Sequence, residues 1–153
     1  MAFIPPEILK KIEYYCAYQE RCQKEVVEKL YALKTPPNII DEILVHLIQE
    51  NFINEERFAC AYARGKHYML GWGKNRIINE LKFRNITNYL INKSLLEINN
   101  EDYDTNFLKL AQKTWTTIHE KNILKKKKKL ADTLLRKGYE TDLIYRFLDT
   151  HNS

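Results

Sequence analysis

The chain has 153 residues, which is enough for one ordinary domain or for a few small repeats. It is 44% hydrophobic and 29% charged with a net charge of +5, and its 4 Gly and 4 Pro are too few for a turn-rich β-sandwich or barrel. Its apolar runs are too short to span a membrane and its first residues lack the apolar core and cleavage site of a signal peptide, so we expect a cytoplasmic protein with no membrane contact.

Apolar residues recur at helical spacing along nearly the whole chain, and no stretch shows the alternation of a strand. An all-α fold is therefore predicted. Asn38 and Asn54 are suitable N-caps for two of the helices, and Asn85 and Gly138 stand where a helix end turns left-handed. The predicted helices begin near Glu7 and then cover residues 20–34, 38–51, 55–69, 74–84, 88–98, 102–119, 123–137 and 142–149.

The helical pattern repeats about every 50 residues, the spacing of stacked helical modules. Residues 81–87 align with residues 134–140. Residues 30–37 align with both of these segments if one extra residue is allowed in the first. In this alignment Pro36, Ile86 and Tyr139 are equivalent positions. We expect tandem three-helix modules in an elongated, curved array, with one compact helical bundle as the alternative. The predicted divisions are an N-terminal helix (1–17), a first module (18–70), a second module (71–120) and a third, truncated module of two helices (121–153).

Positive charge is concentrated in two islands. Residues 57–86 contain seven Lys or Arg and one acid, and residues 121–137 contain eight and one. Helical geometry places Arg57, Arg64 and Arg76 on a polar face. Phe58, Tyr62, Gly65 and Met69 are expected on the buried face of the helix over 55–69.

Two aromatic residues beside the first island have two interpretations each. Phe83 lies on the polar side of its helix, and Trp72 stands between two glycines. Each either packs against a neighbouring module, which we favour, or contacts a partner.

No combination of residues indicates catalysis. The chain has no P-loop, GxGxxG or GxSxG motif, no HExxH and no CxxC pair, and its four histidines are scattered. The three cysteines are expected to be reduced structural thiols. We therefore predict no catalytic residues, no cofactor and no metal.

The centre of the chain resembles the RecX family of regulatory proteins. The first-module pattern of that family is matched by Tyr18-Gln19-Glu20-Arg21-Cys22 with Glu25 and Leu30, although Pro36-Pro37 replaces its usual glycine turn. The resemblance covers about residues 14–149 and is carried mainly by Phe52-Ile53-Asn54-Glu55-Glu56-Arg57-Phe58-Ala59, Ala61-Tyr62-Ala63-Arg64, Gly71-Trp72-Gly73 and Ile77, Glu80, Leu81 and Ile86.

The resemblance implies a monomeric, non-enzymatic regulator of the RecA recombinase in DNA repair and recombination. Such a protein binds the RecA filament on single-stranded DNA and inhibits its ATPase, strand exchange or growth. The alternative is a stand-alone helical-repeat protein that binds DNA or RNA directly. In either case the residues expected to meet RecA or DNA phosphates are Arg57, Arg64, Lys66, Lys74, Arg76, Lys82, Arg84, Lys125, Lys126, Lys128, Lys129 and Arg136.

Overall fold

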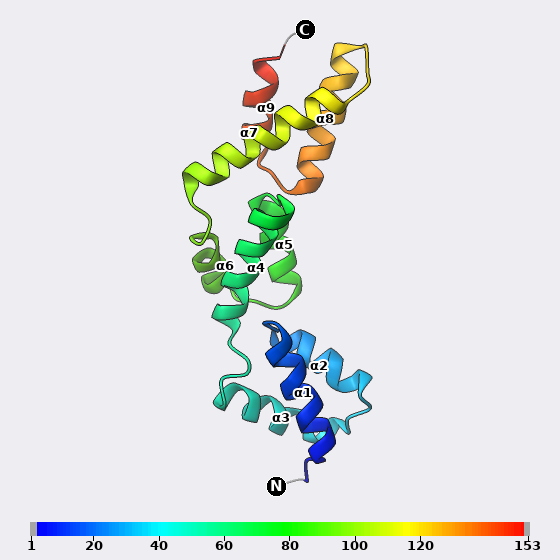
Figure 1. Ribbon diagram of the computed structural model, residues 1–153, viewed down its shortest axis with the longest axis vertical. Coiled ribbons are helices and arrows are strands. Elements are labelled where there is room, and N and C mark those ends of the chain that lie inside the picture. Colours follow the sequence, from blue (N-terminus) through cyan, green and yellow to red (C-terminus); the bar gives the residue numbers. More distant parts are fainter. Residues whose placement is uncertain (1–2, 152–153) are drawn as a thin grey trace.

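The computed structural model describes residues 3–151, and these residues form nine helices and no strand (Figure 1). The prediction of an all-α fold is confirmed. The helices are α1 (Pro6–Tyr18), α2 (Gln23–Ala32), α3 (Pro37–Gln49), α4 (Glu55–Leu70), α5 (Lys74–Phe83), α6 (Asn88–Leu95), α7 (Asn100–Thr117), α8 (Ile123–Lys137) and α9 (Thr141–Asp149).

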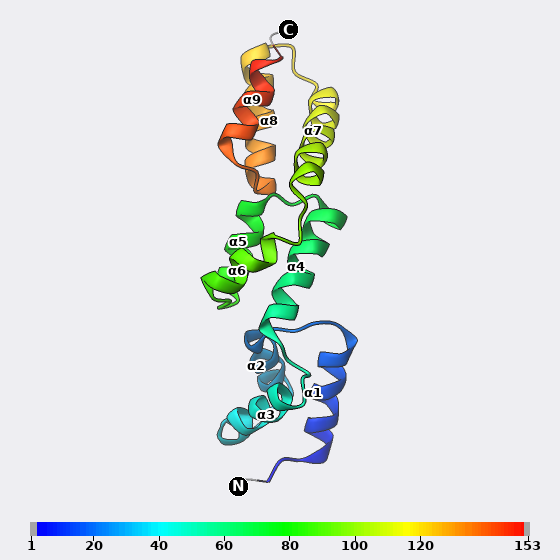
Figure 2. The same cartoon turned by 90° about the vertical axis from the view of Figure 1, so that its left-hand side faces the viewer.

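The helices lie in three groups that follow one another along the long axis of the molecule, α1–α3, α4–α6 and α7–α9 (Figures 1 and 2). The first and last helices lie at opposite ends. The predicted elongated array is therefore confirmed, and a single compact bundle is not formed. Surfaces on different groups are spread along the molecule, so they can reach separate parts of an extended partner.

The helices group differently from the predicted modules. Helix α1 packs on α2 and α2 on α3, and α4 packs chiefly on α6 and α5. Each group therefore begins one helix earlier than the module predicted for it at residue 18, 71 or 121. The reason is that α4 belongs to the core of α5 and α6, which contains Phe58, Ile77 and Ile91.

Two hydrophobic cores hold the array together. The first is formed within α1–α3 by residues such as Ile12, Leu30 and Ile43. The second runs without interruption through the other two groups, from Phe58 to Leu148, and also takes in Cys22, the N-cap of α2, at the junction with the first group. The second and third groups therefore share one continuous core, which the first group touches through Cys22 while most of its own buried residues form a separate core.

The helix caps explain where several helices begin. Asn54 accepts a hydrogen bond from the Arg57 backbone N–H at 2.9 Å, which confirms it as the N-cap of α4. The prediction that Asn38 caps the next helix is wrong, because α3 already begins at Pro37, with Pro36 before it. Proline suits the first helical position, where its fixed φ is helical and no N–H is needed.

Left-handed residues end several helices, as predicted for Asn85 and Gly138, whose φ values are 61° and 101°. The residue after each donates its N–H back into the helix, from Ile86 to Leu81 and from Tyr139 to Leu134, both at 3.1 Å. In the first group Thr35 makes this bond, to Leu30 at 3.0 Å. Pro36 was therefore the wrong equivalent, because proline has no N–H to donate.

The buried face of α4 differs from the predicted one. The structure buries Phe58, Ala59, Ala63 and His67, whereas Met69 is 83% exposed. The two alanines let α4 approach α6 closely. The prediction for Met69 was wrong, because the buried face of α4 is rotated around the helix axis toward α6, relative to the predicted face.

Candidate polyanion-binding surface

The seven cations predicted between residues 57 and 86 do not share one surface. Arg64 forms an ion pair with Glu97, on the side where α4 packs against α6. Lys66 is two residues further along α4, which turns it about 200° away. Its ammonium instead lies 5.0 Å from the ring centroid of Trp72. The predicted basic face is therefore divided between two sides of the second group.

Arg57 closes the junction between the first two groups. Its Nε donates to Glu20 Oε2 at 2.6 Å, and its guanidinium also donates to the Asn51 carbonyl at 3.0 Å. These bonds tie the end of α1 and the loop before α4 to the first turn of α4. Arg57 thus positions the first two groups relative to one another.

Arg84 makes a second connection across the same junction. Its guanidinium lies 2.8 Å from Glu80 of α5 and 3.6 Å from Glu25 of α2, and only 22% of its side chain is exposed. Nearby, Lys24 of α2 lies 3.5 Å from the ring centroid of Phe83 and donates to the Phe83 carbonyl at 2.8 Å. Phe83 therefore contacts the neighbouring group through Lys24, as the favoured interpretation expects, although 65% of it is exposed.

Three cations and two aromatic rings alternate across α4 and α5, and we call this set the cation–aromatic ladder. The Arg84 guanidinium lies 5.1 Å from the Tyr62 centroid, and Lys66 is 5.1 Å from the same ring. Lys66 is also beside the Trp72 ring, whose centroid lies 4.0 Å from the Arg76 guanidinium. Each such contact is worth about 0.5–1 kcal/mol at a partly exposed site. The ladder holds positive charge against aromatic faces.

The ladder was missed in the sequence, where Tyr62 was assigned to the buried face. One signal was available. Tyr62 and Lys66 are four residues apart on α4, and this spacing places side chains together on a helix. Trp72 precedes the N-cap of α5, so its contact with Arg76 does not follow from helical spacing. The approach of the two pairs could not be read from spacing, because it depends on how α4 and α5 pack.

At its far end the ladder meets the third group. Arg76 of α5 and Arg136 of α8 line a common hollow of about 500 Å³. Arg136 uses its Nε to contact the Asp132 carbonyl at 3.3 Å, so no carboxylate neutralises it among the bonds of the described residues. The two predicted basic islands therefore meet at these two arginines.

The hollow depends on a close approach of two backbones. The N–H groups of Gly73 and Asn75 donate to the carbonyls of Lys137 and Gly138, at 2.8 and 2.9 Å. The start of α5 thereby caps the end of α8, so the opposite ends of two helix dipoles meet. The Tyr139 hydroxyl adds a bond to the Gly71 carbonyl at 2.9 Å. The connector Gly71-Trp72-Gly73 thus fixes Arg76 beside α8.

The remaining predicted cations are distributed along the molecule. Lys82 is exposed on α5. Lys74 lies 4.5 Å from the Tyr103 centroid, and Lys126 lies 4.2 Å from that of Trp115. Lys128 pairs with Asp132 at 3.2 Å, whereas Lys125 and Lys129 are exposed in the first half of α8, about 20 and 14 Å along the helix from Gly138.

A buried histidine braces the α4–α7 contact. His67 Nδ1 lies 2.9 Å from the Trp72 carbonyl and Nε2 lies 3.1 Å from the Asn106 amide nitrogen. Because a carbonyl only accepts, Nδ1 carries the proton, and Nε2 accepts from the amide. This arrangement uses both ring nitrogens of His67 in packing, and its ring lies 5.2 Å from that of Tyr103.

Two of the three cysteines are buried structural thiols. Burial raises the pKa of the Cys16 and Cys22 thiols to about 11, so both are protonated near neutral pH. No cluster of three or more His, Cys, Asp or Glu within residues 3–151 could hold a metal ion. In the same part of the chain no helix is long and apolar enough to cross a membrane.

Two family descriptions match the second and third groups of helices. Residues 54–95 match the RecX second three-helix domain, and residues 101–148 match the RecX third three-helix domain. The chain belongs to the RecX family. The two matches agree with the grouping of α4–α6 and α7–α9 by packing.

Individual proteins of the RecX family agree with this assignment. Regulatory protein RecX of Bacillus cytotoxicus is 31% identical over 130 residues, which is 85% of this chain and 48% of that protein. Regulatory protein RecX of Bacillus thuringiensis is 30% identical with the same coverage. The chain thus spans about half the length of the curated relatives it matches.

Solved structures show the same fold. The crystal structure of RecX from Lactobacillus salivarius has a TM-score of 0.76 and 26% identity, and the alignment covers 94% of this chain and 96% of that one. A second crystal structure of a regulatory protein RecX has a TM-score of 0.83 at 22% identity, covering 95% and 72%. The helical-repeat fold of the RecX family therefore extends over nearly all of this chain, including α1–α3.

Proposed function

We propose that the protein is a non-catalytic regulator of the RecA recombinase. It binds the RecA filament on single-stranded DNA as a monomer in the cytoplasm and lowers ATP hydrolysis, strand exchange or filament growth. The observation that carries the proposal is membership of the RecX family, matched over both the second and the third three-helix domain. The absence of a recognisable catalytic motif in the sequence supports a binding role.

The elongated shape supports a filament as the partner. The cation–aromatic ladder lies in the second group, and the exposed Lys125 and Lys129 lie in the first half of α8 in the third. These two groups follow one another along the long axis (Figure 1). Two weak contacts on one rigid body act together, because the second forms at the high effective concentration that the first creates. A repeating partner can offer both contacts at once.

Within this proposal the predicted cations have two roles. Arg57, Arg64 and Arg84 pair with carboxylates of this chain: Arg57 and Arg84 join the first two groups, and Arg64 acts within the second. The filament contacts are assigned to cations without a carboxylate partner on the ladder, on α5 and on α8. These are Lys66, Lys74, Arg76, Lys82, Lys125, Lys126, Lys129 and Arg136, whereas Lys128 is paired with Asp132.

The test is the ATPase of RecA on single-stranded DNA with this protein added below the stoichiometry of RecA. We expect inhibition by the unsubstituted chain and a loss of most of it in Arg76→Glu/Arg136→Glu. Lys109→Glu, which reverses an exposed charge on α7, is the matched control and should inhibit normally. Unchanged ATPase, filament length and strand exchange with the unsubstituted chain would refute the proposal.

A second candidate is a helical-repeat protein that binds DNA or RNA without RecA. The cation–aromatic ladder favours it, because cations beside Tyr62 and Trp72 suit phosphates and bases. This candidate requires tight binding to free nucleic acid at physiological salt, with a steep salt dependence. Weak binding to free DNA beside strong binding to the filament would instead favour the regulator of RecA.

A further inference from the structure

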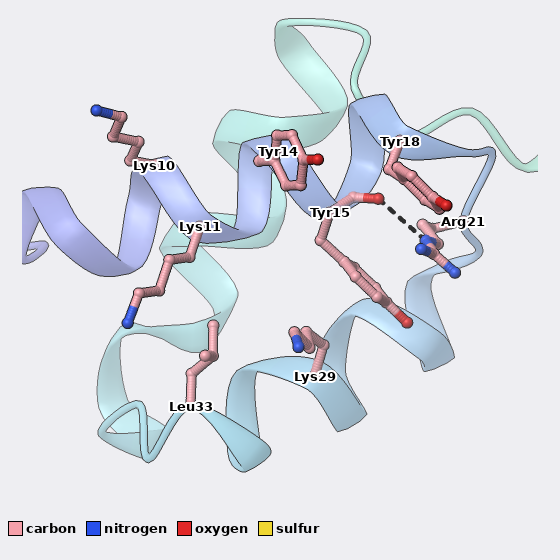
Figure 3. A pocket seen from close by; sticks show the side chains of 8 residues that line it. All are labelled: Lys10, Lys11, Tyr14, Tyr15, Tyr18, Arg21, Lys29 and Leu33. Atoms are coloured by element: carbon pink, nitrogen blue, oxygen red, sulfur yellow. Dashed lines mark hydrogen bonds between the residues drawn. The ribbon is translucent and has the colours of Figure 1, made fainter.

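A hollow of about 520 Å³ lies between α1 and α2 (Figure 3), at the end of the molecule away from α8 (Figure 1). Its size is within the usual range for ligand sites, roughly 300–1,000 Å³. It is in the first group of helices, which contributes nothing to the cation–aromatic ladder. Its lining combines tyrosines and cations. Charge counting does not predict such a site, since residues 1–56 contain ten acids and six Lys or Arg.

The charge of the hollow is opposite to that of the segment around it. Lys10, Lys11, Arg21 and Lys29 line it, which is four of the six Lys or Arg in residues 1–56. None of the ten acids of that segment is among its lining residues. Four cations without a carboxylate between them attract a ligand that carries negative charge.

Tyrosine rings supply the other part of the hollow. Tyr14 and Tyr18 are 69% and 71% exposed, one turn apart on α1, with ring centroids separated by 6.3 Å. Tyr15 extends from α1 toward α2, as Figure 3 shows. The Arg21 guanidinium fixes this third ring, because it lies 3.7 Å from the Tyr15 centroid and its Nε donates to the Tyr15 carbonyl at 3.0 Å.

We propose that this hollow binds single-stranded nucleic acid. Bases stack on the exposed faces of Tyr14 and Tyr18, and the phosphates lie near Lys10, Lys11 and Lys29. A single strand offers both a flat ring and a phosphate in every nucleotide, whereas an acidic peptide would use the lysines and leave the tyrosine faces in water. A duplex keeps its bases stacked inside and cannot present them to the rings. The binding needs no RecA.

The test is fluorescence anisotropy of a labelled oligo(dT) of about 16 nucleotides, with the full chain and no RecA present. Tyr14→Ala/Tyr18→Ala should weaken binding by about tenfold or more, because each base that stacks on an aromatic ring adds to the binding free energy. Tyr31→Ala is the matched control, since Tyr31 is 56% exposed on α2 but does not line the hollow. Tyr14→Phe/Tyr18→Phe keeps the rings and should bind normally.

Two further measurements separate bases from phosphates. An abasic strand of the same length should bind more weakly than oligo(dT) and should be insensitive to Tyr14→Ala/Tyr18→Ala. Lys10→Gln/Lys11→Gln should reduce the slope of log affinity against log salt by about 1.4, which corresponds to two phosphates of a single strand.

Three results would overturn the inference. The first is no binding of oligo(dT) to the unsubstituted chain at low salt. The second is equal affinity of the Tyr14→Ala/Tyr18→Ala and Tyr31→Ala variants, and the third is equally strong competition by polyglutamate. Because RecA is absent from every sample, these results are independent of the ATPase test of the proposed function.

Discussion

Gly73 and Gly138 lie in contact across the junction between the second and third groups of helices. A Cβ on Gly73 would lie 2.4 Å from the carbonyl carbon of Gly138, which is closer than real side chains approach a backbone. A Cβ on Gly138 would lie 2.4 Å from the Cβ of Arg76. The same junction places Arg76 beside Arg136. The close approach of the two glycines therefore sets the position of the two arginines in the candidate site.

We expect Gly73→Ala to lower the free energy of unfolding by about 2 kcal/mol or more, because the start of α5 must move away from α8. The φ of Gly73 is −79°, which alanine adopts freely, so steric contact alone accounts for the loss. Urea denaturation measures it. Gly65→Ala is the control, since its Cβ would meet nothing within 4 Å and a helical Gly→Ala change adds up to about 1 kcal/mol. Equal stability of the two variants would contradict the close approach.

The first junction is predicted to depend on Arg84. Replacing it with Met leaves the carboxylates of Glu25 and Glu80 without their shared cation, so we expect a loss of about 1–2 kcal/mol. A double-mutant cycle of Arg84→Met with Glu25→Gln should give a coupling energy of about 0.5–1 kcal/mol by urea denaturation.

The pair Arg146–Asp142 is the control for this cycle. Both side chains are 73% exposed and lie one turn apart on α9, so water screens their attraction. Their coupling energy should be close to zero. A coupling between Arg84 and Glu25 no larger than this would show that Arg84 does not join the first two groups.

The buried thiols predict a loss of stability at high pH. Burial raises the pKa of Cys16 and Cys22 from 9.0 to about 11, so folding favours the protonated thiols. Their contribution is complete below pH 9 and is lost as the pH rises through about 11. We expect the free energy of unfolding in urea to fall across this window by up to about 2 kcal/mol per thiol. The fall should be smaller in Cys16→Ala/Cys22→Ala.

The same burial predicts the order in which the thiols react. Cys60 is partly exposed, whereas Cys16 and Cys22 are buried. Iodoacetamide at about pH 8 should therefore modify Cys60 first, as peptide mass mapping can show. In urea all three should react at similar rates. Rapid modification of Cys22 in the folded chain would contradict its burial at the junction.

Local features of the fold could be predicted from the sequence. Helical spacing predicts the bounds that α8 has in the structure. The left-handed conformation of Asn85 and Gly138 is also predictable, because a helix end depends on residues next to it in sequence. The N-cap at Asn54 follows the same rule. These features rest on contacts within a few residues, so an isolated segment of sequence contains the information.

The arrangement of the candidate site could not be predicted in the same way. Arg57 meets Glu20 across 37 residues, and Arg84 meets Glu25 across the same junction. Charge counting places both arginines in one basic island, but only packing reveals that carboxylates of another helix hold them. The hollow beside Tyr14 was hidden for the converse reason, because the acids of residues 1–56 outnumber its cations in sequence but do not line it.

Co-sedimentation with RecA filaments tests the central claim most directly. The protein is mixed with RecA assembled on single-stranded DNA, or with the same DNA alone, at physiological salt, and the pelleted fraction is measured. The account predicts that the chain pellets with the filament far more than with naked DNA, and that Arg76→Glu/Arg136→Glu pellets much less than Lys109→Glu. A chain that stays in the supernatant with RecA filaments would contradict it.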